Sequence, residues 1–84
     1  MVQREVMVRM DRGLDTRPVA MLVQVASRFK SDIRIEVENK KVNAKSIMGM
    51  MTLGLVTGES VQVIAEGADE EEALNEVEAF LTQE

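Results

Sequence analysis

Hydrophobic and polar residues alternate in three stretches of the chain, which are residues 2–10, 32–38 and 61–66. Because successive side chains of a β-strand point to opposite faces, this period of two predicts strands with one buried and one solvated face. Three residues depart from the alternation: Arg4 occupies an apolar position of the first stretch, and Met7 and Ile64 occupy polar positions of the first and third. The apolar positions are Val2, Val6, Val8 and Met10, then Ile33, Ile35 and Val37, then Val61, Val63 and Ala65.

Two other stretches repeat their apolar residues every three to four positions, which predicts amphipathic helices. The first covers residues 16–30 and begins near Asp15 or Thr16, because Pro18 is tolerated only in the first helical turn. The second follows Asp69, whose spacing to Glu72 resembles a capping box. The two stripes are Val19, Leu22, Val23, Ala26 and Phe29, then Ala73, Leu74, Val77, Phe80 and Leu81. Met21 and Val25 lie off the first stripe and are expected to be partly exposed.

A turn and a short helix are predicted in the middle of the chain. Asn39 can adopt a left-handed backbone conformation, so we expect a turn there that returns residues 40–44 as the second arm of a hairpin. Ser46 and Gly54 then bracket residues 47–53, as a serine N-cap and a glycine C-cap bracket a helix. The predicted element order is therefore β-α-β-β-α-β-α within one domain, residues 1–84, and the simplest packing places the helices on one side of a four-stranded sheet.

The short helix is too small to bury all of its apolar residues, which are Ile47, Met48, Met50, Met51 and Leu53. We expect Ile47 and Met50 to face the core and Met48 and Met51 to face solvent. Gly49 inside the helix costs about 1 kcal/mol of helix propensity. This cost is explained if another surface approaches the helix closely at that point.

Composition narrows the function classes. The chain has no Cys and no His, which excludes a disulfide, a Cys/His zinc site and a Ser-His or thiol nucleophile. We therefore expect a protein that is not an enzyme and holds no metal or cofactor. A net charge of −5 and only two Phe as aromatic residues argue against nucleic-acid binding. The longest apolar run, residues 18–23, is far too short to span a membrane, so we expect a cytoplasmic protein.

Two segments carry a more specific pattern, GLDTRPVA at residues 13–20 and KVNAKSIMGMMTL at residues 41–53. Together they closely resemble the two signature segments of the HPr family, the histidine-containing phosphocarriers of the bacterial sugar phosphotransferase system. The resemblance covers the whole chain. It implies an α+β fold, the HPr-like open-faced sandwich, in which a four-stranded antiparallel sheet carries three helices on one face.

Asp15 is the departure from this pattern, because members of the family that carry phosphate have a histidine at this position. A carboxylate can accept phosphate as an acyl phosphate, but such sites usually combine Mg²⁺ with clustered acids. The neighbours here are Thr16, Arg17 and Pro18. We therefore expect the carrier reaction to be lost, and the resemblance is strongest to the regulatory branch of the family, which lacks the histidine and keeps the serine. That branch typically carries glutamine where Asp15 stands.

In that branch the resemblance implies that Ser46 is phosphorylated by HPr kinase/phosphorylase and that the product is a corepressor of the transcription regulator CcpA. It implies no direct contact with nucleic acid or membrane, and it allows a homodimer formed by exchange of the first strand. The expected partner-binding residues are Asp15, Thr16, Arg17, Met21, Lys45, Ser46, Ile47, Met48, Gly49 and Met51.

Simpler interpretations stand beside these. Asp15 and Ser46 are both good N-cap residues and need no further role. Arg17 can be an ordinary solvated arginine, and methionines can merely fill an aliphatic core. The alternative function is a phosphocarrier that accepts phosphate on Asp15.

Overall fold

The computed structural model describes residues 1–9, 16–53 and 58–82, with residues 16–19 described by their backbone alone. Its elements are β1 (Val2–Met7), α1 (Thr16–Ser27), β2 (Asp32–Val37), β3 (Lys40–Asn43), α2 (Ile47–Leu53), β4 (Ser60–Glu66) and α3 (Glu70–Leu81). This order confirms the predicted β-α-β-β-α-β-α arrangement. Of the described helices, none is long and apolar enough to cross a membrane.

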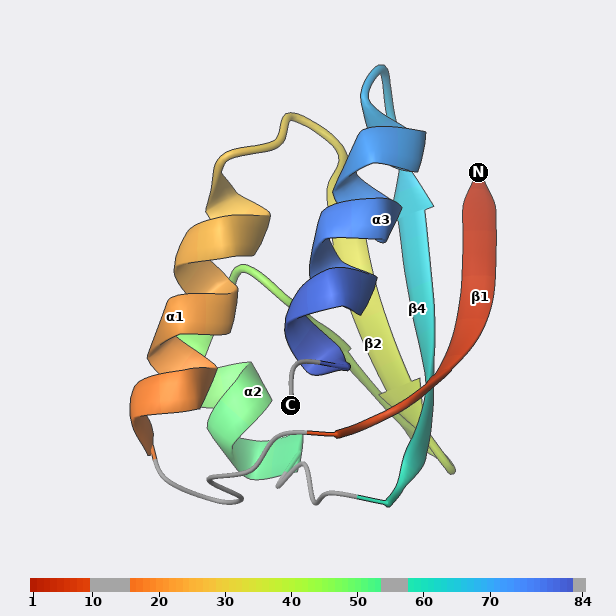
Figure 1. Ribbon diagram of the computed structural model, residues 1–84. Coiled ribbons are helices and arrows are strands. Elements are labelled where there is room, and N and C mark those ends of the chain that lie inside the picture. Colours follow the sequence, from red (N-terminus) through yellow and green to blue (C-terminus); the bar gives the residue numbers. More distant parts are fainter. Residues whose placement is uncertain (10–15, 54–57, 83–84) are drawn as a thin grey trace.

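The four strands form one antiparallel sheet in the order β1-β4-β2-β3. In this register Val6 lies opposite Val61 and Ile35 lies opposite Val63, so the apolar residues of neighbouring strands share a face. The helices cover that face, with α3 against β1 and β4, α2 against β3, and α1 against both other helices (Figure 1). The α+β open-faced sandwich is therefore confirmed.

The core is aliphatic, and the alternation along each strand explains which residues enter it. Val61, Val63 and Ala65 of β4 are buried while Gln62 and Ile64 between them are partly exposed. Among the described side chains, the predicted helical stripes are buried in the same way, except that Phe29 and Phe80 are half-buried, and the side chain of Val19 lies outside the described part. Met21 is exposed and Val25 is half-buried, as their positions off the stripe predict.

Arg4 interrupts the apolar face of β1 because it serves a polar contact. Its guanidinium pairs with the carboxylate of Glu78 and donates to the Asn75 amide oxygen at 3.2 Å, both on α3. An inward-facing charge on an edge strand is one of the ways in which natural sheets discourage pairing with other sheets. Arg4 therefore joins β1 to α3 by a charged contact where the pattern of the strand would place an apolar residue.

The hairpin turn differs from the prediction by one residue. The positive φ of 55° falls on Glu38 and not on Asn39. The register places Val37 opposite Lys40, so the turn consists of Glu38 and Asn39, and its first residue takes the left-handed conformation. The prediction relied on the intrinsic tolerance of Asn for this conformation, whereas the strand register decided which residue adopts it.

The predicted capping box at Asp69 is also wrong. Asp69 precedes α3 but its side chain makes no capping hydrogen bond. Its carboxylate instead accepts hydrogen bonds from the Lys30 amide at 3.0 Å and from the amide and hydroxyl of Ser31. Glu70 accepts from the Gly67 amide at 3.1 Å, a contact that lowers the pKa of the Glu70 carboxyl.

A close backbone approach explains why Asp69 is used in this way. Ser31 is fully buried, and a Cβ on Gly67 would lie 2.6 Å from the Ser31 Cα. Gly67 also has a φ of +151°, which side chains rarely adopt. The segment that enters β2 and the segment that leaves β4 therefore pack directly on each other, and Asp69 satisfies the backbone amides exposed at that junction.

We predict that this junction makes stability depend on pH below about 4. Hydrogen bonds from the Ser31 hydroxyl and then from the Lys30 amide lower the pKa of Asp69 to about 2. Since the carboxyl has a pKa of about 3.9 in an unfolded chain, its stabilising effect is complete above that value and is lost as the pH falls through 2. Urea unfolding should show Asp69→Asn less stable than the parent at pH 7, with a difference that shrinks between pH 4 and pH 2. A difference that is constant with pH would contradict this assignment.

Candidate functional site

Ser46 lies at the entrance to α2, where two hydrogen bonds of Asn43 shape the chain. The Asn43 side-chain oxygen accepts from the Lys45 amide at 2.8 Å, and its backbone oxygen accepts from the Ser46 amide at 3.0 Å. The Ser46 hydroxyl oxygen in turn accepts from the Gly49 amide at 3.1 Å. The predicted N-cap is therefore confirmed. Sequence reasoning overlooked Asn43, although an Asn two residues before a polar turn position is a known signal for an Asx-turn.

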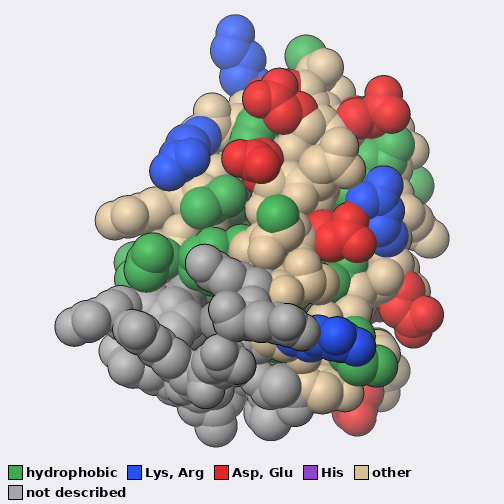
Figure 2. Space-filling model, in the orientation of Figure 1, with side chains coloured by type: hydrophobic (Ala, Val, Ile, Leu, Met, Phe, Trp, Pro, Cys, Tyr) green, Lys and Arg blue, Asp and Glu red, His purple; other side chains and the backbone are tan. Residues whose placement is uncertain are grey.

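The residues that follow Ser46 expose a large apolar area. Met48 is 81% exposed, and Met51, Met21 and Ile47 are about half exposed, at 51%, 49% and 48%. Met50 is fully buried. We call Ser46 with Met21, Ile47, Met48 and Met51 the Ser46 surface, which joins α2 to the neighbouring α1. Figure 2 shows hydrophobic side chains gathered over α1, beside the residues drawn in grey.

Ile47 corrects one prediction, because it was expected in the core. It is the first residue of α2. Side chains of a helix tilt toward its N-terminus, so at this position Ile47 projects beyond the helix end. The core beneath α2 is filled by Met50 and Leu53. The outward positions predicted for Met48 and Met51 are confirmed.

Lys45 and Gly49 determine what surrounds the Ser46 hydroxyl. The Lys45 ammonium donates to the Phe29 carbonyl at 2.7 Å, so this lysine ties the start of α2 to the segment after α1. A Cβ added at Gly49 would lie 3.4 Å from both the Ser46 Oγ and the Val42 Cβ. This is ordinary van der Waals contact, so the glycine is not required for packing. Its absence of a side chain leaves room directly beside the hydroxyl.

The other predicted segment is only partly described. Asp15 lies outside the described residues, so the structure does not test its role as cap, recognition residue or phosphoacceptor. Thr16 and Arg17 are the first residues of α1, which confirms the predicted start of that helix. Their side chains also lie outside the described part.

The charge around Ser46 differs from that of the chain as a whole. Residues 40–53 contain Lys40, Lys41 and Lys45 and no acid, although the chain has a net charge of −5. A negative group added to Ser46 would meet no carboxylate from its own segment. Within residues 1–9, 16–53 and 58–82, no group of three or more carboxylates is arranged to hold a metal ion.

Comparisons with known proteins show the family and the fold of the chain. The family model for the PTS HPr component phosphorylation site matches residues 2–83. The HPr-like protein Crh of Bacillus subtilis (strain 168) is 52% identical over 84 residues, which are 100% of this chain and 99% of that protein. The crystal structure of the phosphocarrier protein HPr from Bacillus anthracis str. Ames has a TM-score of 0.91 at 49% identity, with 95% of each chain covered. The crystal structure of Bacillus subtilis Crh, a dimer with a swapping domain, has a TM-score of 0.80 at 52% identity, covering 100% of this chain and 97% of that one.

Substitutions at Ser46 and Gly49 should change stability in opposite directions. Ser46→Ala removes the acceptor for the Gly49 amide and should lower the free energy of unfolding by about 1 kcal/mol. Gly49→Ala places a methyl group in ordinary van der Waals contact with Ser46 and Val42. It should raise the free energy of unfolding by up to about 1 kcal/mol, because alanine loses less backbone entropy than glycine when a helix forms. Chemical denaturation of both variants and the parent measures this. A destabilised Gly49→Ala would show that the backbone of α2 requires a glycine there.

Proposed function

Because the chain belongs to the HPr family, we propose that it is a regulatory HPr-like protein whose switch is phosphorylation of Ser46. HPr kinase/phosphorylase is the proposed modifying enzyme. The phosphorylated form is proposed to act in the cytoplasm as a corepressor of CcpA in carbon catabolite repression, by binding and not by catalysis. The observation that carries this proposal is the position of Ser46, at a helix start within an exposed apolar surface.

The geometry of Ser46 suits a kinase substrate. Its hydroxyl oxygen accepts one hydrogen bond, from the Gly49 amide, while the side chain remains partly exposed. The space left by Gly49 lets an approaching group reach the oxygen without displacing a neighbouring side chain. Transfer from ATP would form the bond between the Ser46 oxygen and the γ-phosphorus, break the bond to ADP and release the hydroxyl proton.

The surroundings of Ser46 also suit recognition of the product. A phosphate adds about −1.5 to −2 charges at neutral pH, in a segment that holds lysines and no acids. A partner can pair arginine with that phosphate and cover the adjoining methionines, whose flexible side chains adapt to different surfaces. The Ser46 surface therefore offers one charged and one apolar contact side by side.

Asp15 supports the regulatory function over the carrier function. The carrier reaction needs a neutral imidazole nitrogen that attacks a phosphoryl group, and the chain contains no histidine. We propose that Asp15 serves partner recognition or caps α1, and that this chain does not pass phosphate from enzyme I to sugar transporters.

Mass spectrometry after incubation with HPr kinase/phosphorylase and ATP tests the proposal. We expect one phosphate on Ser46, none on Ser46→Ala, and normal modification of Ser60→Ala, which changes an exposed serine on β4. Gly49→Ala should be modified several times more slowly, because its methyl group contacts the Ser46 oxygen. Binding to CcpA should require the phosphate. If Ser46→Ala bound CcpA as well as the phosphorylated parent, the phosphoserine mechanism would be wrong.

A parallel incubation with enzyme I and phosphoenolpyruvate tests the alternative function. We expect no phosphate on the chain under these conditions. A hydroxylamine-sensitive phosphate on Asp15 would identify an acyl phosphate and favour the phosphocarrier function.

We also propose that the chain forms a homodimer by exchange of β1. The crystal structure of a relative, Bacillus subtilis Crh, is a dimer with a swapping domain, which supports the proposal. In the structure, β1 pairs with β4 of its own chain.

Arg4→Ala separates the kinetics of this exchange from its equilibrium. The contact between Arg4 and Glu78 forms within one chain in the monomer and between chains in the swapped dimer, so its loss affects both states equally. Size-exclusion chromatography with light scattering should therefore give an unchanged dimer dissociation constant. The rate of interconversion should rise up to about fivefold, since an exposed ion pair contributes at most about 1 kcal/mol to the barrier. A shifted equilibrium would show that the contact exists in one state only.

A further inference from the structure

Within the described residues, the outer edge of β1 presents backbone groups that pair with no other strand. β1 stands at one end of the sheet and pairs only with β4 among the described strands. The Val8 amide donates to the Glu59 carbonyl on the β4 side at 2.8 Å. Hydrogen bonding alternates along an antiparallel strand, so Val6, Arg4 and Val2 also face β4. The backbone N–H and C=O groups of Gln3, Glu5 and Met7 therefore point to the open edge.

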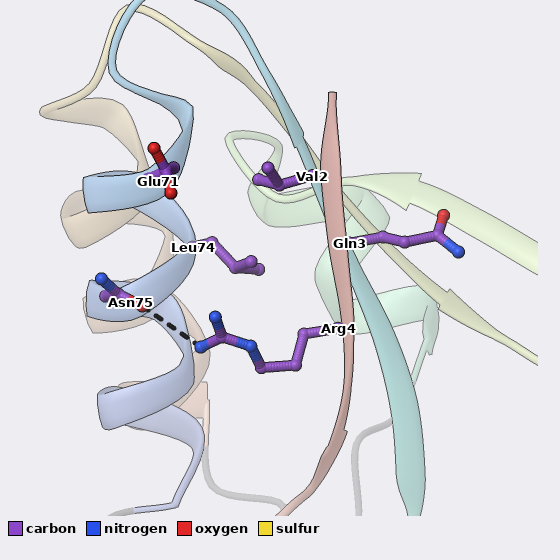
Figure 3. Close-up of a pocket in the computed structure, with 6 residues that line it drawn as sticks. All are labelled: Val2, Gln3, Arg4, Glu71, Leu74 and Asn75. Atoms are coloured by element: carbon purple, nitrogen blue, oxygen red, sulfur yellow. Dashed lines mark hydrogen bonds between the residues drawn. The ribbon is translucent and has the colours of Figure 1, made fainter.

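A groove lies beside this edge, between β1 and α3. It has a volume of about 330 Å³ and is lined by Val2, Gln3, Arg4, Glu71, Leu74 and Asn75. Figure 3 shows that Arg4 and Leu74 reach into the space between the two elements, while Gln3 points away on the other side of β1. The Arg4 guanidinium is held by Asn75 and Glu78. The groove thus combines an apolar part with a carboxylate, Glu71, at its rim.

The charge of this region selects the kind of partner. Residues 46–84 contain no Lys or Arg, and Glu70, Glu71 and Glu78 all lie on α3. Figure 2 shows acidic side chains gathered over α3. Glu5 adds an exposed carboxylate on β1 itself. Glu78 is paired with Arg4 and Glu70 with the Met1 ammonium at 3.2 Å, so the exposed Glu71 is the carboxylate that an arriving segment meets in the groove.

We propose that the β1 edge and this groove bind an extended basic segment of a partner protein, in which Lys or Arg alternates with β-branched residues. The segment adds to the sheet as a strand beside β1, a recognised mode of peptide binding in which backbone hydrogen bonds supply affinity and side-chain contacts supply specificity. Because alternate side chains of a strand share a face, its basic side chains lie on the helix face of the sheet, toward Glu71. The interaction is independent of Ser46, because β1 lies on the opposite side of α3 from α1 (Figure 1).

A second copy of the chain fits this edge less well. In the antiparallel register that pairs all three outward residues, Gln3 meets Met7 and Glu5 meets Glu5 of the copy. Like charges directly opposite each other destabilise a strand pair. Charge complementarity therefore favours a basic partner over self-association.

The probe for this proposal is the peptide acetyl-Lys-Val-Arg-Val-Lys-Val-Lys-amide, titrated into the ¹⁵N-labelled protein. We expect chemical-shift changes along β1 and slower hydrogen exchange at the amides of Gln3, Glu5 and Met7. A peptide with Glu in place of each basic residue should not bind.

A peptide methylated on the backbone nitrogens of its valines keeps the charge but loses the hydrogen-bond donors of those residues. It should also fail to bind if the valine amides face the β1 edge. A second peptide, methylated on the basic residues, tests the opposite facing.

Two charge reversals on α3 localise the contact. Glu71→Lys should raise the dissociation constant of the peptide about fivefold or more, because the attraction between residue 71 and a basic side chain of the peptide becomes a repulsion. Glu76→Lys, an exposed position of the same helix outside the groove, is the matched control and should have little effect. Equal weakening by both variants, or equal binding by both methylated peptides, would show non-specific attraction and overturn the proposal. Protection of the same amides without peptide, rising with protein concentration, would identify a second copy as the occupant and overturn it as well.

Discussion

Burial of one face of a four-stranded sheet is the constraint on which the rest of this structure depends. The chain has no cysteine and only two aromatic residues, so its stability must come from burial of aliphatic side chains. The helices therefore have to cover the aliphatic side chains of that face completely. Ile33, Ile35 and Val63 have no exposed surface at all. Each helix can offer the sheet one stripe only. For the seven-residue α2 that stripe is Met50 and Leu53, and its other apolar residues are left in solvent. The Ser46 surface is a direct consequence of this geometry.

Polar contacts join the helices and strands to one another. Asp69 joins the start of β2 to the start of α3, and Lys45 joins the start of α2 to the segment after α1. Arg4 joins the middle of β1 to α3. Each contact satisfies a backbone group or a charge that the aliphatic core cannot satisfy. This division explains how a small core can determine one arrangement of three helices without disulfides or metals.

Most of the fold could be predicted from periodicity, because burial of one face imposes a repeating pattern on every strand and helix. The errors fall at element ends. Glu38, Ile47 and Asp69 each occupy a terminal or turn position, where the outcome depends on strand register or on a distant segment. Asp69 accepts hydrogen bonds from residues 38 and 39 positions away, which no local pattern encodes.

The candidate site was predictable to a different degree in its two halves. The serine cap follows from local spacing, and the exposed methionines follow from the limited width of a short helix. The contact of Lys45 with Phe29 requires the packing of two helices and could not be read from spacing. Asp15 remains a prediction, as does its proposed place in partner recognition.

The distribution of charge separates the two surfaces that this chain offers to partners. All ten basic residues lie within residues 1–45, and the rest of the chain holds only acids among its charged residues. α3 therefore places carboxylates beside the β1 edge whatever the state of Ser46, with Glu70 and Glu78 paired there to the Met1 ammonium and to Arg4. The segment around Ser46 carries three lysines and no acid until a phosphate is added. The proposed phosphorylation of Ser46 would remove about half or more of that local positive charge without altering the aliphatic core. Such a switch would change what the surface attracts without requiring a second fold.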